Sequence, residues 1–105
     1  MRKQFTDIDE WQRETFPQST AITKLAHLDL ELKELKSDIE SNSKDKRLEL
    51  ADCFMLLIGI AAFEGFTYED VIDALEEKMK INKRRKWGEP DSNGVVSHIK
   101  NSANE

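Results

Sequence analysis

Two pairs of carboxylates with the same spacing are the residues in this sequence best suited to chemistry. Glu31 and Glu34 form one acid-x-x-acid pair, and Glu49 and Asp52 form the other. Each pair falls in a segment predicted to be helical, where residues three positions apart lie on one face. Two such helices packed side by side would bring four oxygen ligands together, which predicts a Mg²⁺ site and a phosphate substrate.

The alternative is that these acids are ordinary solvated charges on helix surfaces. The second pair, however, leads directly into the apolar run from Cys53 to Phe63, where isolated charges are costly to bury. Four acids gathered in a partly buried place would also repel one another, and a cation would relieve that repulsion. On spacing alone both interpretations stay open.

A basic cluster follows further along the chain. Residues 78–86 hold six of the sixteen Lys and Arg side chains, and Lys78, Asn82 and Arg85 share one helical face. Such a face can bind phosphate oxygens. Favourable placement of cations at a helix C-terminus is the alternative, but it does not explain Asn82. A stable nucleic-acid surface fits poorly with the net charge of −5.

Composition sets further limits on the class of protein. With 105 residues, 38% of them hydrophobic, the chain suits one small domain with a modest core, for which oligomerisation is expected. Cys53 alone can form neither an internal disulfide nor a Cys/His zinc pattern, and it is predicted to be a buried small hydrophobe. We find no signal-peptide core and no apolar run long enough for a membrane span, so we expect a cytoplasmic protein.

Four helices and no strand are predicted, which makes the fold class all-α. Pro17 ends the first helix, Ser19 or Thr20 caps the second, and Thr67 starts the fourth in a near capping box with Asp70. Gly88 and Pro90 stop the fourth helix. The predicted ranges are 7–16, 20–41, 46–64 and 67–87.

The second half of the third predicted helix, from Cys53 to Phe63, is apolar all round, as expected of the most buried helix. Two parallel stripes of side chains run along the second predicted helix. The first stripe is apolar and steps by three and four, as in a helix that packs in a bundle. It comprises Leu25, Leu28, Leu32, Leu35 and Ile39. The other is acidic with a histidine at its head, and comprises His27, Glu31, Glu34 and Asp38.

Together these residues resemble the MazG-like branch of the all-α NTP pyrophosphatases. That family's pattern is E-x-x-E, a spacer, E-x-x-D, and a helix bearing Lys, Asn and Arg. Here it reads ELKE at 31–34, ELAD at 49–52 and KMKINKRR at 78–85. WQRETFP at 11–17, HLDLE at 27–31, and KWGEP at 86–90 followed by Gly94 and His98 are similar to the phage-type dATP/dGTP diphosphohydrolase (MazZ-like) group. In one departure, Leu30 stands where MazG proteins often have a further Glu.

The resemblance implies a MazG-like helical domain over residues 1–90, a polar tail over 91–105, and a small bundle completed by oligomerisation. It implies a dimer or tetramer with the site near a subunit interface, in the cytoplasm of a bacterium or of a phage-infected cell. The implied activity is Mg²⁺-dependent cleavage of a (d)NTP, foremost dATP or dGTP, between the α and β phosphates. Mn²⁺ is the expected substitute for Mg²⁺.

The resemblance also implies roles for single residues. The metal ligands are Glu31, Glu34, Glu49 and Asp52, and either Glu31 or Glu34 orients or deprotonates the attacking water. Lys78 and Arg85 neutralise phosphate charge, with Asn82 hydrogen-bonding nearby. Substrate contacts are expected from His27, Trp11, Phe16 and Trp87, although each aromatic could instead pack in the core and His27 could instead bond a carboxylate.

Two other functions stay open at this stage. A non-catalytic helical module would use the acids and the basic face for assembly or partner docking. The same scaffold could also act on a different phosphate substrate, such as dUTP or a phosphoribosyl nucleotide.

Overall fold

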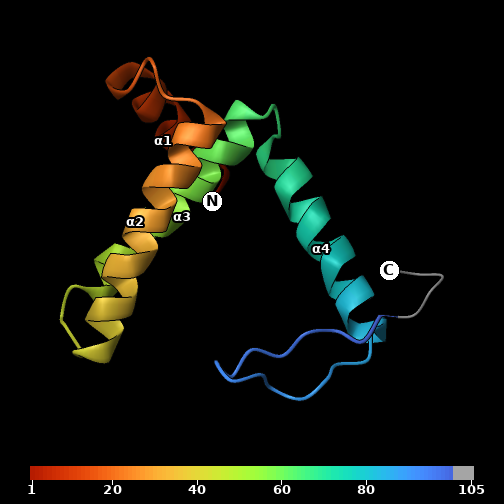
Figure 1. Cartoon of the computed structure of the whole chain (residues 1–105). Coiled ribbons are helices and arrows are strands. Elements are labelled where there is room, and N and C mark those ends of the chain that lie inside the picture. Colours follow the sequence, from red (N-terminus) through yellow and green to blue (C-terminus); the bar gives the residue numbers. More distant parts are fainter. Residues whose placement is uncertain (101–105) are drawn as a thin grey trace. The chain divides into compact units, whose positions relative to one another are not determined.

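The computed structural model describes residues 1–100, which form four helices and no strand (Figure 1). The helices are α1 (Arg2–Thr15), α2 (Ala21–Glu40), α3 (Lys46–Phe63) and α4 (Tyr68–Arg84). The predicted all-α class is therefore confirmed. Residues 101–105, the end of the predicted polar tail, lie outside the described residues.

Reciprocal capping boxes fix the starts of α2 and α4. At α2, Thr20 N donates to Thr23 Oγ1 at 2.8 Å, and Thr23 N donates to Thr20 Oγ1 at 3.2 Å. At α4, Thr67 N donates to Asp70 Oδ2 at 2.8 Å, and Asp70 N donates to Thr67 Oγ1 at 3.1 Å. Each box satisfies backbone N–H groups that have no partner within the helix, and both predicted starts are confirmed.

The predicted start of the first helix and the predicted end of the fourth were wrong, in both cases because of contacts with residues further along the chain. α1 begins at Arg2 instead of residue 7, since Phe5 is buried and packs edge-on against Tyr68, with ring centroids 6.2 Å apart. α4 ends at Arg84, three residues before Trp87. Trp87 instead forms an isolated antiparallel bridge with His98.

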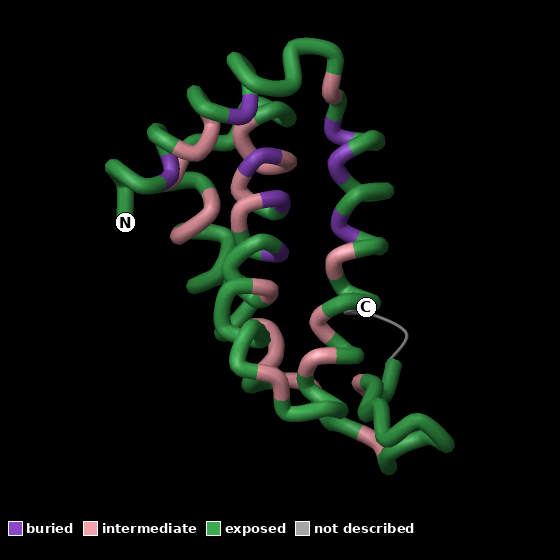
Figure 2. Tube along the Cα trace, turned by 90° about the vertical axis from the view of Figure 1, so that its left-hand side faces the viewer, coloured by how far each residue is buried: buried purple, intermediate pink, exposed green. Residues whose placement is uncertain are grey.

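The chain divides into two compact units, residues 1–71 and 72–105, and each is described by itself. The predicted division at residue 90 stays a prediction. In the first unit α2 and α3 run side by side and α1 packs on α3 (Figures 1 and 2). In the second unit the rest of α4 leads into a turn, where Gly88 N donates to the Ser97 carbonyl at 2.9 Å.

The core of the first unit is small. Leu28, Cys53 and Leu56 are buried together, with Leu35 and Ile60 packed against them. Cys53 is a buried small hydrophobe, as predicted. Burial first, then the charges of nearby acids, raise the pKa of its thiol, so it is not a reactive thiolate.

The predicted apolar stripe of α2 is only half right. Leu28 and Leu35 pack in the core, but Leu25, Leu32 and Ile39 are exposed. The buried face is rotated toward Ala21 and Lys24 instead, because α3 packs against that side, with Lys24 beside Gly59.

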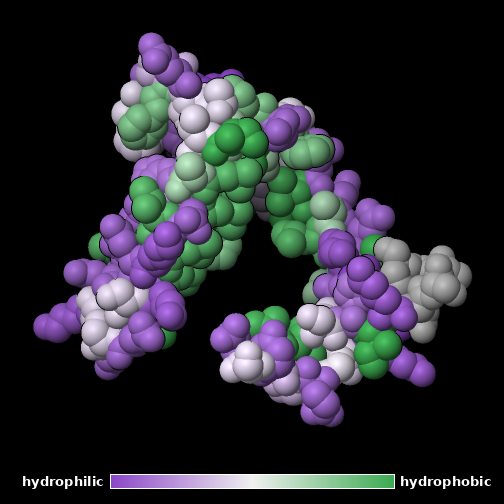
Figure 3. All heavy atoms as spheres, in the orientation of Figure 1, coloured by the Kyte–Doolittle hydropathy of each residue, from purple (hydrophilic) through white to green (hydrophobic). Residues whose placement is uncertain are grey.

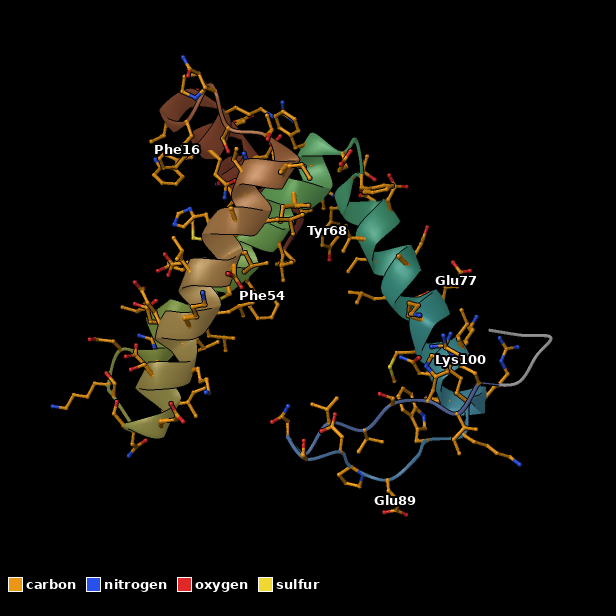
Figure 4. The ribbon with its side chains drawn as sticks, in the orientation of Figure 1. Phe16, Phe54, Tyr68, Glu77, Glu89 and Lys100 are labelled. Atoms are coloured by element: carbon orange, nitrogen blue, oxygen red, sulfur yellow. The ribbon has the colours of Figure 1, made fainter. Side chains whose placement is uncertain are left out.

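Within the first unit, the third helix buries the face that carries Cys53, Leu56 and Gly59. Phe54 is 55% exposed and Leu57 is 49% exposed on the opposite side. Hydrophobic side chains are visible at the surface along α2 and α3, and Phe54 is labelled among them (Figures 3 and 4). Among the described residues, no single helix has the length and hydropathy of a membrane span; the bent pair α3 and α4 reaches them only when taken together.

Candidate metal centre and adjoining cavity

Three of the four predicted ligands converge between α2 and α3. Glu31, Glu49 and Asp52 each place a carboxylate oxygen within 4.8 Å of the others. Glu49 and Asp52 lie one turn apart on α3, and Glu31 faces them from α2, because the two helices pack side by side. The acid-x-x-acid spacing thus produces a cluster of hard oxygen donors.

The electrostatics of this cluster favour a cation. Burial first, and then the neighbouring carboxylates of Glu31, Glu34 and Asp38, raise the pKa of Glu49 to about 7. Within the described residues, Oε2 of Glu31 and Oε2 of Glu49 are buried and have no hydrogen-bond partner. Unpartnered carboxylate oxygens around one point are the donor set that Mg²⁺ or Mn²⁺ takes, so these residues fit a divalent cation.

Glu34 and His27 flank the cluster on α2. Glu34 is exposed and lies outside the group of three, one turn beyond Glu31, although its charge contributes to the raised pKa of Glu49. His27 Nε2 lies 3.1 Å from Glu31 Oε1. The histidine therefore contacts a carboxylate, which is one of its two predicted roles, and it holds one oxygen of Glu31 in place.

A cavity of ≈ 460 Å³ adjoins the acids in the first unit. Trp11 and Phe16 contribute to its wall, with their rings edge to face at 5.6 Å between centroids. Figure 4 labels Phe16, just beyond the C-terminal end of α1. The lining residues are Trp11, Gln12, Phe16, Ser19, Thr23, Lys24, His27, Glu31, Asp52, Met55 and Leu56. Acids, aromatics and His27 thus meet around one space, as a nucleotide site would require.

Two polar residues of this wall, Gln12 and Lys24, were not singled out from the sequence. Both are almost fully buried, with 4% and 5% of their surfaces exposed. Gln12 Nε2 donates to the Met55 carbonyl at 2.8 Å, and Lys24 Nζ donates to Ser19 Oγ at 2.9 Å. One signal was available, since Lys24 continues the three-and-four stepping of Leu28 and Glu31 along the same face.

The predicted basic face lies in the second unit. Arg85, one residue beyond the end of α4, donates from Nη1 to Asn82 Oδ1 at 3.4 Å, and Trp87 Nε1 donates to the Asn82 carbonyl at 3.1 Å. Lys78 lies one turn before Asn82 on α4. The approach of these four residues to a bound phosphate or base stays a prediction.

Comparisons with known proteins agree on one family. A family model described as dATP/dGTP pyrophosphohydrolase matches residues 1–105. A dATP/dGTP diphosphohydrolase of cyanophage S-2L is 35% identical over 71 residues, which make up 68% of this chain and 64% of that relative. This chain therefore spans less than two thirds of that relative's length.

A solved structure agrees with the family match. It is the cyanophage S-2L MazG-like pyrophosphohydrolase bound to dGDP and three catalytic Mn²⁺ ions per active site. It superposes with a TM-score of 0.75 at 29% identity, over 91% of this chain and 93% of that one.

Proposed function

Since this chain belongs to the dATP/dGTP pyrophosphohydrolase family, we propose that it hydrolyses purine deoxynucleoside triphosphates between the α and β phosphates. The products would be a deoxynucleoside monophosphate and pyrophosphate. The observation that supports this most is the cluster of Glu31, Glu49 and Asp52 beside a cavity walled by Trp11 and Phe16. Hydrolysis of a triphosphate needs a cation site and a nucleoside pocket next to each other, and this arrangement offers both.

Glu31, Glu49 and Asp52 would hold Mg²⁺ or Mn²⁺, and Glu34, the fourth predicted ligand, would lie beside this group without binding the cation directly. The bound cation would supply positive charge to the phosphate oxygens and lower the pKa of water. The unpartnered buried oxygens of Glu31 and Glu49 support this assignment, since the protein alone leaves them uncompensated.

Glu34 suits the role of proton acceptor for the attacking water. It lies one helical turn from Glu31 but outside the three-acid group, so it can take a proton without giving up a place in that group. Lys78 and Arg85, with Asn82 beside Arg85, would neutralise charge that moves onto the leaving pyrophosphate. Trp11 and Phe16 would stack on the base, with Trp87 as a further aromatic contact.

A homo-oligomer would complete the bundle. The exposed apolar side of α3, which includes Phe54 and Leu57, supports a dimer or tetramer with the site near the subunit interface. We place the enzyme in the cytoplasm of a bacterium or of a phage-infected cell, where its substrates are made, without stable binding to nucleic acid or membrane.

The direct test is pyrophosphate release from a panel of dATP, dGTP, dCTP, dTTP and dUTP, with and without Mg²⁺. We expect metal-dependent release that is fastest with the two purine nucleotides. Asp52→Asn should lower turnover by a hundredfold or more, because the cluster loses a charged ligand, and its helical circular dichroism should not change.

Asp29→Asn is the matched control for that variant. Asp29 is an exposed acid of α2 that pairs with Lys33 at 3.4 Å, away from the cluster, so this variant should keep full activity. No release from any nucleotide by folded protein, or full activity of Asp52→Asn, would contradict the proposal.

A further inference from the structure

Lys24 is a buried cation without a carboxylate partner. Only 5% of its surface is exposed, and no carboxylate of the described residues lies within ion-pair distance of its Nζ. Its one hydrogen-bond acceptor there is the Ser19 hydroxyl, and its Nζ lies 5.2 Å from the centre of the Phe63 ring. An ammonium group has three donors, so Lys24 retains hydrogen-bonding capacity at the wall of the cavity.

Gly59 on α3 leaves the space that the side chains of Lys24 and Gln12 occupy. A Cβ at Gly59 would lie 3.0 Å from Lys24 Cε and 1.9 Å from Gln12 Oε1, so only glycine on α3 admits both side chains. The Gln12 amide is fixed in turn by its bond to the Met55 carbonyl. Burial, followed by the charge of Arg13, lowers the pKa of Lys24, because the surroundings disfavour its protonated, charged form.

The position of Lys24 separates it from the phosphate end of the site. Lys24 and Glu31 line the same cavity from α2, seven residues apart, which corresponds to roughly 10 Å along a helix axis. The sugar and base of a nucleotide extend beyond its α-phosphate over a comparable length. With phosphates at the acids, Lys24 therefore lies beside the base, together with Trp11 and Phe16.

We propose that Lys24 determines base specificity by donating hydrogen bonds to N7 of a bound purine, and to O6 as well when the base is guanine. This inference rests on the proposed function, since it takes the acids as the phosphate end. Guanine presents N7 and O6 as adjacent acceptors, whereas adenine presents N7 beside an amino donor. Pyrimidines lack N7. Lys24 would thus select purines and favour guanine over adenine.

The first arm of the test changes only the ligand. Steady-state kinetics of the wild-type protein would compare dGTP, 7-deaza-dGTP, dATP and dCTP, because the 7-deaza analogue replaces N7 by a carbon. A hydrogen bond to a charged donor is worth about tenfold to a hundredfold in binding. We therefore expect the KM for 7-deaza-dGTP to exceed that for dGTP by about tenfold or more, with little change in kcat.

The second arm changes the protein. Lys24→Met keeps most of the length of the side chain and removes its charge, and Lys33→Met is the control, because Lys33 is an exposed lysine of the same helix. Lys24→Met should raise the KM for dGTP by about tenfold to a hundredfold and abolish the difference between dGTP and 7-deaza-dGTP. Its KM for dCTP should stay unchanged, as should every KM of Lys33→Met.

Two results would overturn the inference. One is an equal effect of Lys24→Met on dGTP and dCTP, which would assign the lysine to the phosphates or to packing. The other is a wild-type protein that treats dGTP and 7-deaza-dGTP alike. If the wild-type protein releases no pyrophosphate at all, the proposed function fails, and calorimetric binding of dGDP and 7-deaza-dGDP then decides the inference in the same way.

Discussion

At the scale of single residues, Glu49 has a pKa of about 7, because burial and the surrounding carboxylates disfavour its charged form. In the unfolded chain its pKa would return to the ordinary value of a glutamate. Between those two pKa values the folded state binds more protons than the unfolded state, so stability falls as pH rises. The unpaired charge of Glu49 thus weakens the metal-free protein near neutral pH.

We predict that the thermal midpoint of the metal-free protein, measured by circular dichroism in EDTA, decreases as pH rises from about 4.5 to about 7. Added Mg²⁺ should raise the midpoint most above pH 7, because it binds the ionised cluster. Glu49→Gln should flatten the pH dependence. A thermal midpoint of the wild-type protein that stays level or increases between about pH 4.5 and about pH 7 would show that folding does not raise the pKa of Glu49.

The residues of the site differ in how far their positions could be predicted. The approach of Glu31 to Glu49 and Asp52 follows from the helical spacing together with the short loop that makes α2 and α3 neighbours, whereas Glu34, predicted with them, lies outside the group. The burial of Lys24 and Gln12 was not predicted, since both residue types are usually exposed, and only the stepping of Lys24 with Leu28 indicated it. Their burial depends on Gly59, whose role appears only when three helices meet.

At the scale of the helices, Gly59 sets how closely α1 approaches α3. Gly59→Ala would force the Gln12 amide away from the Met55 carbonyl, because the new Cβ would lie 1.9 Å from Gln12 Oε1. We predict a net loss of about 1–2 kcal/mol in the free energy of unfolding, although alanine favours a helix by about 1 kcal/mol. Urea denaturation would measure it.

The Gln12→Ala background provides the control. There the clash with the amide is gone, so Gly59→Ala should lose most of its destabilising effect and could become stabilising. An equal loss in both backgrounds would mean that the tight contact between α1 and α3 does not limit this position.

Helix starts were predictable where the signal is local, whereas the start of α1 and the end of α4 were not. The capping box of Thr67 and Asp70 lies within four residues, so the sequence contains the whole interaction. The early start of α1 depends on Phe5 packing against Tyr68, sixty-three positions later in the chain, and the early end of α4 depends on pairing between Trp87 and His98.

At the largest scale, the first unit leaves large apolar side chains of α3 exposed. Phe54 and Leu57 are about half exposed on the side away from the core. Light scattering should therefore report a mass that is a multiple of the 12.2 kDa protomer. Phe54→Asp should shift that mass toward 12.2 kDa, because it introduces a charge into the proposed interface.

The exposed residue Ile22 of α2 provides a control for that variant, since Ile22→Asp also adds one acid but away from α3. It should leave the mass unchanged. A wild-type protein of 12.2 kDa at micromolar concentration would contradict the oligomer.

Attack of water on the α-phosphorus can be measured by hydrolysis of dGTP in ¹⁸O-labelled water with Mg²⁺, followed by mass spectrometry of the products. We predict one ¹⁸O atom in dGMP and none in the pyrophosphate that is released with it. Label in pyrophosphate, or formation of dGDP and orthophosphate, would contradict attack at the α-phosphorus.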